Sequence, residues 1–357
     1  MIRIGEMYSI GRVVGKGVYG VVREAHSATG EPVVFKHVSS CLDDTNYWIR
    51  IYREIKFLRM LRHDHVVELK DVVVDQGDCG PHGPLKPGIS MVFEKMDCDL
   101  EVAIESRMKL DPIRVIHQIL LGLDHLHDHN IVHRDLKPSN VLINADGLVK
   151  IADLGISRRI TSRHDDTASW TGYVVTRWYR APEVCGKYYT HTKAIDGWAV
   201  GCIFAEMLDN GRPLFRGSSN EDQLLKTFSI FDRPDKETLQ TLQPYARGAI
   251  EKYFDAIQGR EGRGSKKLDE TFKDVDKVSL DLLKKLLEFD PMRRITCKDA
   301  LDHPAFASIG YRRRSRRKRT RVELDGDPNI EEGIGWTVEN TWAFVMRKVD
   351  EVQQDLR

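Results

Sequence analysis

His133 to Leu142 read HRDLKPSNVL, and the rest of the chain is organised around this stretch. It places a histidine-arginine pair, one carboxylate, one lysine and one amide within ten residues. Before it, apolar residues recur at helical spacing from Ile113 to Leu126, and after it Val141 to Ile143 read as a short buried strand. A dense polar cluster on a loop between two regular elements is typical of a catalytic site.

The composition sets the broad class of the protein. The 357 residues are enough for about two domains of ~150 residues each. With 55 basic and 54 acidic residues, the net charge of +1 does not favour nucleic acid or a membrane as the main partner. The exception is residues 312–321 (RRRSRRKRTR), which carry eight arginines and lysines; without them the body is mildly acidic.

The cysteines and the N-terminus bear on the compartment. Six cysteines are scattered without CxxC spacing, so neither a zinc site nor a disulfide framework is indicated, and a reducing compartment is expected. The first residues, MIRIGEMY, lack an apolar core, and no run of about 18 apolar residues occurs. We therefore expect a soluble protein of the cytoplasm or the nucleus.

Periodicity divides the chain into two parts. From residue 8 to 38, short β-rich runs separated by glycines predict an antiparallel meander. Residues 46–62 predict a helix with one apolar face, residues 66–74 and 89–94 predict strands, and the Gly- and Pro-rich residues 77–88 predict a loop. After Met96 the pattern is helix-rich, with expected helices at 198–208, 279–289 and 340–352, while the charge of residues 311–328 predicts disorder.

Residues 15–20 read GKGVYG, a GxGxxG pattern formed by Gly15, Lys16, Gly17 and Gly20. By itself this pattern also fits an ordinary hairpin turn. It lies between two strand runs and does not open a helix, which argues against a dinucleotide-binding Rossmann unit; a glycine hairpin can instead fold over phosphates. Lys36 ends the apolar run VVFK, where a lysine either faces solvent or pairs with a carboxylate such as Glu54.

These motifs together resemble those of eukaryotic protein kinases. The resemblance covers about residues 8–307 and has the expected order: GxGxxGxV ending at Val22, VVFK, HRDLKPSN, Asp153-Leu154-Gly155 where Asp-Phe-Gly is usual, and Ala181-Pro182-Glu183. It implies an α+β, bilobal protein kinase fold, with a β-rich N-lobe at about 8–96 and a mainly α-helical C-lobe at about 97–307. Residues 308–357 would form a C-terminal extension with the basic tract and a late helix.

The resemblance also implies ATP and Mg²⁺ as cofactors. Lys36, held by Glu54, would bind the α- and β-phosphates, and Asn140 and Asp153 would supply the oxygen ligands that Mg²⁺ prefers. Asp135 would accept the proton of the substrate hydroxyl, and Lys137 would neutralise the γ-phosphate. The remaining expected contacts to ATP are Gly15, Lys16, Gly17, Gly20, Val22, Val34, Glu94, Met96 and Leu142. Considered singly, Asp135 or Asp153 also fits a capping or turn aspartate.

The segment TGYVVTRWYRAPE, residues 171–183, resembles that of MAP kinases, whose activation lip carries a Thr-x-Tyr pair. An upstream dual-specificity kinase would phosphorylate Thr171 and Tyr173, and each phosphate adds about −1.5 to −2 charges. Arg53, Arg134 and Arg158 would bind the phosphate on Thr171, and Arg177 and Arg180 the phosphate on Tyr173. The alternative is that these arginines only coat a polar surface. The same resemblance implies protein substrates with Ser/Thr-Pro sites and a monomer.

Other residues follow from the resemblance. Asp196 matches the aspartate that braces the catalytic loop, and Arg294 matches the partner of Glu183. Leu154 replaces the usual phenylalanine, which we interpret as tuning, because the metal-binding Asp153 is retained. Phe93 stands at the gatekeeper position, where MAP kinases usually differ, and the acidic residues that MAP kinases use for docking appear only after the basic tract.

Two alternative functions remain. A cyclin-dependent-like kinase would need a partner subunit at the helix of residues 46–61, whereas the Thr-x-Tyr pair favours activation by phosphorylation. A pseudokinase scaffold would bind partners without phosphoryl transfer, but the motif residues of the active site are all present. The basic tract fits a flexible solvated segment, a nuclear-import signal or a contact to nucleic acid or an acidic partner. Without interleaved aromatics it does not indicate specific reading of RNA.

Overall fold

The structure is a computed structural model. It describes residues 7–17, 20–39, 45–75, 79–80, 83–84, 88–160, 176–185, 192–231, 247–248, 251–252, 255, 268–310 and 343–349. Thr171, Tyr173 and the basic tract lie outside the described residues. The described residues form two compact units. The first comprises those up to Asp97, Ala152–Ile156 and 343–349; the second comprises Cys98–Ile151 and those from Ser157 to residue 310.

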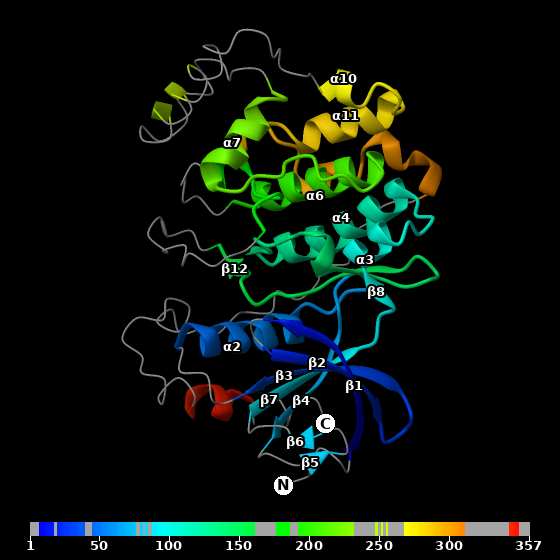
Figure 1. Cartoon of the computed structure of the whole chain (residues 1–357), viewed down its shortest axis with the longest axis vertical. Helices are drawn as coiled ribbons and strands as arrows, with labels where there is room; N and C mark the ends of the chain where they lie inside the picture. Colours follow the sequence, from blue (N-terminus) through cyan, green and yellow to red (C-terminus); the bar gives the residue numbers. More distant parts are fainter. Residues whose placement is uncertain are drawn as a thin grey trace. The chain divides into compact units, whose positions relative to one another are not determined.

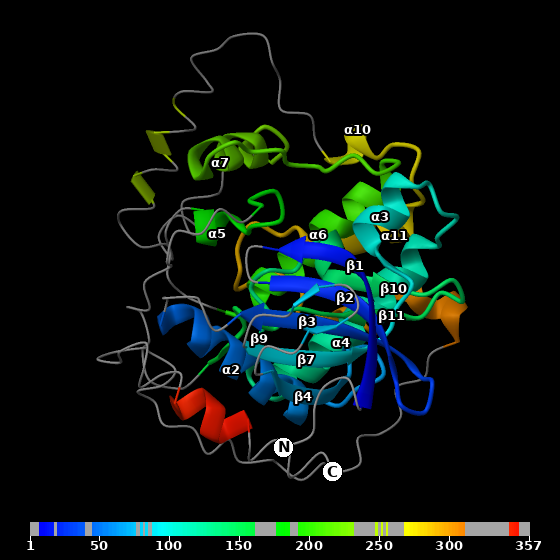
Figure 2. The same cartoon turned by 60° about the horizontal axis from the view of Figure 1, so that its bottom comes forward.

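The first unit is built on a five-stranded antiparallel sheet (Figures 1 and 2). Its strand order is β1-β2-β3-β7-β4, so β7 lies between β3 and β4. The bounds are β1 (Tyr8–Gly17), β2 (Gly20–Ser27), β3 (Pro32–Ser39), β4 (Leu69–Asp75) and β7 (Gly88–Glu94). The predicted meander of residues 8–38 is confirmed as β1 to β3.

Alternation along β3 separates a face in the core from the face that carries Lys36. Successive side chains of a strand point to opposite faces of the sheet. Val33 and Phe35 are almost fully buried in a cluster with Ala25, Val73 and Val92. Lys36 lies on the other face, together with Val34. The sheet therefore buries an apolar face and presents Lys36 on the opposite one.

The two edge strands of the sheet, β1 and β4, are also connected. The hydroxyl of Tyr8 on β1 donates a 2.9 Å hydrogen bond to Oδ2 of Asp71 on β4. The Tyr8 ring meets Phe35 edge to face, with centroids 4.9 Å apart. Because β1 and β4 stand at opposite ends of the strand order, this contact requires the sheet to curl around its apolar core.

Helix α2 (Thr45–Met60) is the main helix of the first unit. Its buried residues, among them Trp48, Ile51, Ile55 and Leu58, recur at intervals of three and four and form the apolar face expected from the sequence. Glu54 is buried with them, only 2% exposed. A buried carboxylate needs a partner, so α2 brings a charged group to a place where a cation has to lie.

Residues 343–349 are helical and lie beside α2 in both views (Figures 1 and 2). The ring of Phe344 meets that of Tyr52 on α2 edge to face, with centroids 5.1 Å apart. Val345 and Val349 are each 1% exposed. The predicted late helix is therefore confirmed over residues 343–349, and it packs within the first unit.

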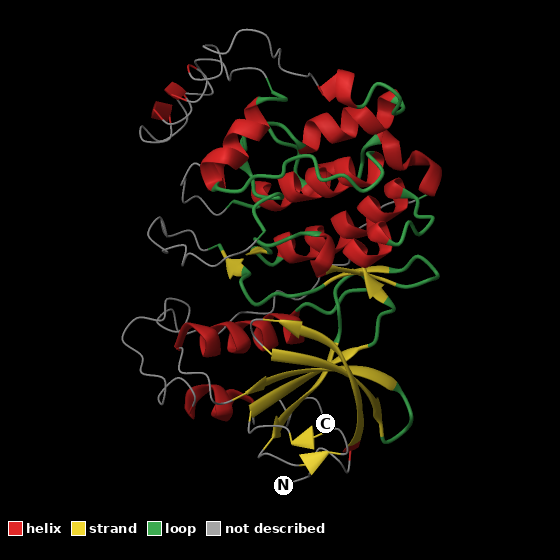
Figure 3. Ribbon diagram, viewed as in Figure 1, coloured by secondary structure: helices red, strands yellow, loops and turns green. Residues whose placement is uncertain are grey.

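The second unit is mainly helical, whereas the strands concentrate in the first (Figure 3). Its elements are α3 (Leu100–Glu105), α4 (Pro112–Asp128), α5 (Pro182–Cys185), α6 (Ala194–Leu208), α7 (Asn220–Phe228), α10 (Leu268–Thr271), α11 (Lys277–Leu286), α12 (Cys297–Ala300), η1 (Pro138–Asn140) and η2 (Pro304–Ile309). The second unit also contains the short strands β8 (Cys98–Asp99), β9 (Ile131–Val132), β10 (Val141–Ile143), β11 (Val149–Ile151) and β12 (Arg158–Arg159).

Helix α6 is the centre of the second unit. It is apolar on nearly every side, and α4 and α11 both pack against it. Trp198 is 0% exposed and stacks on Phe215 at 5.8 Å. A helix that is apolar all round is a core helix, so the polar Asp196 and Glu206 on α6 are exceptions that need partners.

The predicted α+β fold, with a β-rich N-terminal part and a helical C-terminal part, is confirmed. The predicted loop at 77–88 was incomplete, because two-residue strands β5 (Cys79–Gly80) and β6 (Gly83–Pro84) pair within it. Such short pairs leave no periodic signal. In the described part of the chain, no helix combines the length and the apolar character needed to cross a membrane.

Candidate active site

Lys36 and Glu54 form an ion pair in the first unit. Nζ of Lys36 lies 2.8 Å from Oε1 and 2.9 Å from Oε2 of Glu54. The Lys36 side chain is 22% exposed and that of Glu54 only 3%. Removing either group would leave the other buried without its charge partner, which is strongly destabilising. The pairing expected between VVFK and the following helix is therefore present.

Asp153 joins this pair. Its Oδ1 lies 3.8 Å from Nζ of Lys36, and its own side chain is 46% exposed. Its backbone is left-handed, with φ of 62°, a conformation that non-glycine residues rarely adopt. A Cβ added at Gly155 would lie 3.3 Å from Oδ1 of Asp153 and 3.5 Å from Oε2 of Glu54, so glycine keeps this crowded corner open.

The charges around Lys36 favour its protonated form. Burial by itself lowers the pKa of Lys36, but the carboxylates of Glu54 and Asp153 outweigh that effect and raise it. The lysine is therefore a permanent cation. A cation fixed between two carboxylates and still partly exposed can bind an anion such as phosphate.

The glycine pattern forms the hairpin between β1 and β2. Gly17 pairs with Gly20, and Gly15 lies opposite Val22, with Lys16 between the two glycines on β1. A Cβ at Gly20 would stand only 2.1 Å from the carbonyl oxygen of His37, so no larger residue fits there. Residues 18 and 19, at the tip, lie outside the described residues.

The residues expected around the adenine fall on both units. Val22 is the cross-strand partner of Lys36, so Val22, Val34 and Lys36 share one face of the sheet. Glu94 ends β7 and Met96 follows it, both in the first unit, whereas Leu142 lies on β10 in the second. All three apolar side chains, Val22, Val34 and Leu142, are half-buried and so leave surface for a ligand.

In the second unit, the loop from His133 to Asn140 is held by Asp196 of α6. Oδ2 of Asp196 accepts hydrogen bonds from the backbone N–H of His133 and from Nε2 of His127, both at 2.9 Å. Oδ1 accepts from the backbone N–H of Arg134, also at 2.9 Å. Burial raises the pKa of Asp196, but these donors outweigh it and lower the pKa below its usual value.

Asp135, Lys137 and Asn140 are brought together at the end of this loop. Nζ of Lys137 lies 3.1 Å from Oδ2 of Asp135. Nδ2 of Asn140 donates to the backbone oxygen of Asp135 at 2.7 Å and to its Oδ2 at 3.2 Å. The Asp135 side chain is 16% exposed, so its carboxylate is held by Lys137 and Asn140 and is still accessible to a reactant. Arg134 has a left-handed φ of 74°, which marks the loop as constrained.

A second buried ion pair joins Glu183 on α5 to Arg294. Nη1 and Nη2 of Arg294 donate to the two oxygens of Glu183 at 2.7 and 3.0 Å. Arg294 also lies over the ring of Trp198, 5.0 Å from its centroid. This is the partnership predicted for Glu183, and its bidentate form gives it geometric specificity.

Comparisons with known proteins show the family to which the chain belongs. A family model described as "Protein kinase domain" matches residues 8–306. The chain belongs to the protein kinase domain family. It is 40% identical over 308 residues to "Mitogen-activated protein kinase 13" of Oryza sativa subsp. indica, covering 85% of this chain and 58% of that protein. It is also 39% identical to "Mitogen-activated protein kinase 17" of Arabidopsis thaliana, over 85% of this chain and 61% of that protein.

The chain therefore spans between about half and three fifths of the length of the curated relatives it matches; the share for "Mitogen-activated protein kinase 12" of Oryza sativa subsp. japonica is 51%, at 38% identity. In protein kinases generally, ATP is the phosphoryl donor and Mg²⁺ bridges its phosphates. Mg²⁺ is often bound by only one or two protein carboxylates together with phosphates and waters. The donor types of Asp153 and Asn140 suit it, since both provide hard oxygen ligands.

The kinase domain places the five predicted phosphate-binding arginines in both units. Arg53 is on α2 in the first unit. In the second, Arg158 on β12 pairs with Val132 on β9, and Arg134 lies two residues after the end of β9. Arg177 and Arg180 lie on the segment before Ala181, where the N–H of Arg180 donates to the carbonyl of Arg177 at 3.0 Å. Nη1 of Arg180 also donates to Oδ1 of Asn220 at 3.3 Å.

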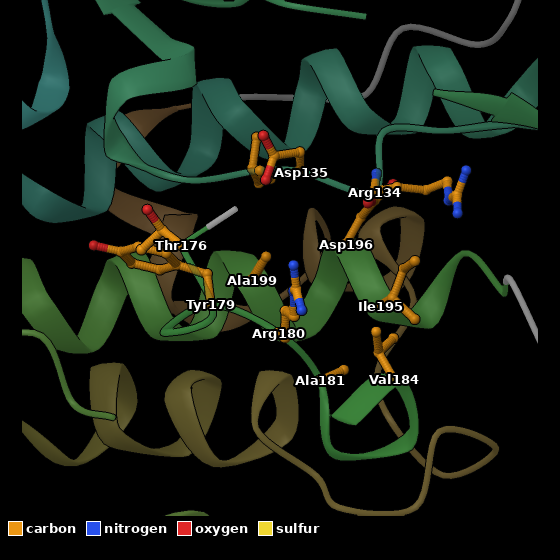
Figure 4. Close-up of a pocket in the computed structure, with 11 residues that line it drawn as sticks. Arg134, Asp135, Thr176, Tyr179, Arg180, Ala181, Val184, Ile195, Asp196 and Ala199 are labelled. Carbon is orange, nitrogen blue, oxygen red and sulfur yellow. Dashed lines mark hydrogen bonds between the residues drawn. The ribbon is translucent and has the colours of Figure 1, made fainter. Parts of the chain in front are cut away.

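A pocket adjoins Asp135 in the second unit (Figure 4). Thr176, Tyr179 and Arg180 form one side of it, and Figure 4 shows them across from Asp135. Its remaining lining is Arg134, Leu136, Ala181, Val184, Ile195, Asp196 and Ala199. The small and apolar members of that set suit a compact apolar side chain next to the carboxylate.

Two buried polar residues beside this pocket were not predicted. The hydroxyl of Tyr179 donates to Oε2 of Glu206 on α6 at 2.7 Å. Burial, with a smaller contribution from Glu101, raises the pKa of Glu206 to about 7, although the hydrogen bond from Tyr179 opposes the shift. Gln223 on α7, which is 0% exposed, bonds to the backbone of Trp178. The available signals were a glutamate within the apolar run GCIFAEML and a glutamine on the apolar side of α7.

Proposed function

We propose that this chain is a MAP-kinase-like serine/threonine kinase that transfers the γ-phosphate of ATP to Ser/Thr-Pro sites in proteins. The observation that carries the proposal is the buried Lys36–Glu54 ion pair with Asp153 beside it. Phosphoryl transfer depends chiefly on positioned cations and dipoles, and a cation clamped in this way is the arrangement that phosphate binding requires. We propose residues 8–307 as the kinase domain.

In this mechanism the second unit acts on the protein substrate. The carboxylate of Asp135 accepts the proton as the substrate hydroxyl oxygen bonds to the γ-phosphorus and the bond to the β-phosphate oxygen breaks. Lys137, 3.1 Å from Asp135, supplies positive charge to the transferred group. Asn140 orients Asp135 through two hydrogen bonds. The products are ADP and the phosphorylated protein.

The cofactor assignment follows from the donor groups. Lys36 holds the α- and β-phosphates, and Asp153 and Asn140 each provide an oxygen ligand for Mg²⁺. When bound there, Mg²⁺ would supply positive charge that offsets the charge of the phosphates. The glycine hairpin of Gly15, Gly17 and Gly20 covers the phosphates, and the half-buried Val22, Val34 and Leu142 contact the base, with Glu94 and Met96 providing backbone hydrogen bonds.

Activation by phosphorylation of Thr171 and Tyr173 is part of the same proposal. Phosphates at these positions need arginines, and the sequence supplies Arg53, Arg134 and Arg158 for the first and Arg177 and Arg180 for the second. An upstream dual-specificity kinase would add both groups. Protein substrates and this activating kinase are the partners we propose.

The contact between α2 and residues 343–349 supports a self-contained kinase over one that needs a separate subunit. Tyr52 on α2 is covered by Phe344 of the same chain, 5.1 Å between ring centroids. A cyclin-like partner would have to dock on this helix, where the chain's own C-terminal helix already packs. We therefore favour activation by phosphorylation.

The test is label transfer from radiolabelled ATP. The chain is incubated with a Ser-Pro peptide or its Ser-Ala counterpart, before and after treatment with an upstream dual-specificity kinase, with Asp153→Ala in parallel. We expect transfer to Ser-Pro that rises after treatment and is lost in Asp153→Ala. Absence of transfer when Thr171 and Tyr173 are phosphorylated would favour a pseudokinase scaffold. Transfer that requires an added cyclin-like subunit would favour the cyclin-dependent alternative.

A further inference from the structure

Gln223 holds the backbone of two separate segments. Its Nε2 donates to the carbonyl oxygen of Trp178 at 3.0 Å, and its Oε1 accepts from the N–H of Gly217 at 2.9 Å. The side chain is 0% exposed. A Cβ at Gly217 would come within 2.4 Å of that same Oε1, so the Gln223 side chain packs tightly against the backbone of Gly217. Both ends of the amide are thus used, one as donor and one as acceptor.

Asn220 and Lys226, also on α7, each contact one of these two segments. Asn220 accepts from the guanidinium of Arg180 at 3.3 Å. Lys226 donates to the carbonyl of Arg216, whose own guanidinium lies 5.4 Å from the ring centroid of Trp178. Asn220, Gln223 and Lys226 are spaced by three residues, which places them on neighbouring positions of the helix surface. Helix α7 therefore holds Trp178 and Arg180, which flank Tyr179.

This segment forms one side of the pocket beside Asp135. Thr176, Tyr179 and Arg180 line it, whereas Trp178 is not among its lining residues (Figure 4). Fixing the carbonyl of Trp178 consequently fixes the backbone from which Tyr179 and Arg180 project. The second support of Tyr179, its hydrogen bond to Glu206, comes from α6. Gln223 thus acts on the pocket through the backbone.

We propose that Gln223 is a positioning residue for the protein substrate, because it sets the shape of the pocket that receives a side chain next to the phosphorylated residue. This inference rests on the proposed kinase function and extends it. Gln223 does not touch the reacting atoms. Its loss should weaken the binding of peptide and leave the binding of ATP unchanged.

The decisive variant is Gln223→Glu, which keeps the size of the side chain. A carboxylate cannot donate to the Trp178 carbonyl, and two oxygens would face each other in a buried place. A protonated carboxyl group can donate, and burial raises the pKa of a carboxylic acid. Relative to wild type at each pH, we expect the KM for a Ser-Pro peptide to rise about tenfold at pH 8 and clearly less at pH 6, with an unchanged KM for ATP.

Gln118 offers a matched control. On α4, its Nε2 donates to the Gly147 carbonyl at 2.8 Å and its Oε1 accepts from the N–H of Val149 at 3.0 Å. This is the same kind of bridge, and none of its three residues lines the pocket. Gln118→Glu should leave both KM values as in wild type. If Gln223→Glu does not fold, Arg216→Ala, which removes an exposed group over Trp178, should still raise the peptide KM about twofold to fivefold.

Peptide binding measured by calorimetry separates this inference from the proposed function. If wild type binds the Ser-Pro peptide without transferring phosphate, the kinase proposal fails, yet weaker binding by Gln223→Glu alone would still support the role of Gln223. An unchanged peptide affinity in Gln223→Glu, or an equal loss in Gln118→Glu, would overturn it. No peptide binding by wild type would overturn it as well.

Discussion

Lys36 is the residue on which the first half of the site depends. It lies between two carboxylates, at 2.8 Å from Glu54 and 3.8 Å from Asp153, and the alternation of β3 holds it on the face of the sheet opposite the core cluster. Glu54 is buried by the apolar face of α2, so its charge has to be neutralised locally. The same arrangement that satisfies the fold thus presents a fixed cation to phosphate.

Glu54→Gln should test this at the residue scale. The amide keeps the shape but loses the charge that fixes Lys36, so we expect kcat/KM to fall about 10²-fold and the KM for ATP to rise. Steady-state kinetics with a Ser-Pro peptide measure both. The control is Glu31→Gln, which removes the exposed partner of Lys70 at 2.7 Å. Equal kinetics in the two variants would contradict a role of Glu54.

Glu206 should make stability depend on pH. Burial raises its pKa from 4.5 to about 7, so the folded protein holds this proton more tightly than the unfolded chain. The stabilising contribution is therefore greatest below pH 4.5 and is lost as the pH rises to about 7. Glu206→Gln keeps an acceptor for Tyr179 and does not titrate, so its stability relative to wild type should rise by about 2–3 kcal/mol between pH 4.5 and 8.

Denaturant unfolding at several pH values measures this difference. Glu270→Gln, at an exposed position on α10, is the control and should show no trend. A constant difference between Glu206→Gln and wild type across this range would mean that Glu206 is already ionised at pH 5 in the folded protein, contrary to the account.

The residues that the sequence predicted and those it missed differ in how they are recognised. Lys36, Asp135, Asn140 and Asp153 each stand in a short local motif, and Glu54 was the carboxylate proposed to pair with a lysine in an apolar strand. Glu206 and Gln223 could not be predicted, since their partners Tyr179 and Trp178 lie 27 and 45 residues away and only folding brings them together. A polar residue among the apolar positions of a helix is a signal that it is buried, but that signal does not tell which distant group it bonds.

At the scale of elements, α2 is held from two sides. Its Glu54 contacts Lys36 of β3, and its Tyr52 contacts Phe344 of the C-terminal helix. The residues are two positions apart and so point in different directions around the helix. A change at the outer contact can therefore loosen the helix that carries Glu54.

Phe344→Ala should destabilise this contact. Loss of the ring and of its edge-to-face contact with Tyr52 should lower stability by about 1–3 kcal/mol. Hydrogen exchange should speed up first in residues 45–60, because α2 loses its cover. The control is Met292→Ala, at a side chain that is 82% exposed in the second unit. Unchanged exchange in α2 would show that the C-terminal helix does not support it.

Elements with a long periodic pattern were predicted closely. The helix expected at 46–62 is α2 at Thr45–Met60, and that expected at 198–208 is α6, which begins earlier at Ala194. The start of α6 was missed because no side chain caps it: Lys193 makes no capping hydrogen bond. The pair β5 and β6 was missed because two residues cannot show alternation.

At the scale of the whole molecule, the polar residues that we propose for phosphoryl transfer are divided between the two units. Lys36, Glu54 and Asp153 belong to the first, and Asp135, Lys137 and Asn140 belong to the second. Each group is internally organised by its own hydrogen bonds and ion pairs. We propose that the residues of the first unit bind the phosphates of ATP, whereas Asp135 in the second unit removes the proton of the substrate hydroxyl.

The most direct test of this claim compares wild type with Asp135→Asn after phosphorylation of Thr171 and Tyr173. Phosphate transfer to a Ser-Pro peptide and nucleotide affinity are measured on the same preparations. We expect Asp135→Asn to transfer phosphate about 10²–10⁴-fold more slowly while binding ATP as wild type does. Equal transfer rates in the two proteins, or no transfer by wild type, would contradict it.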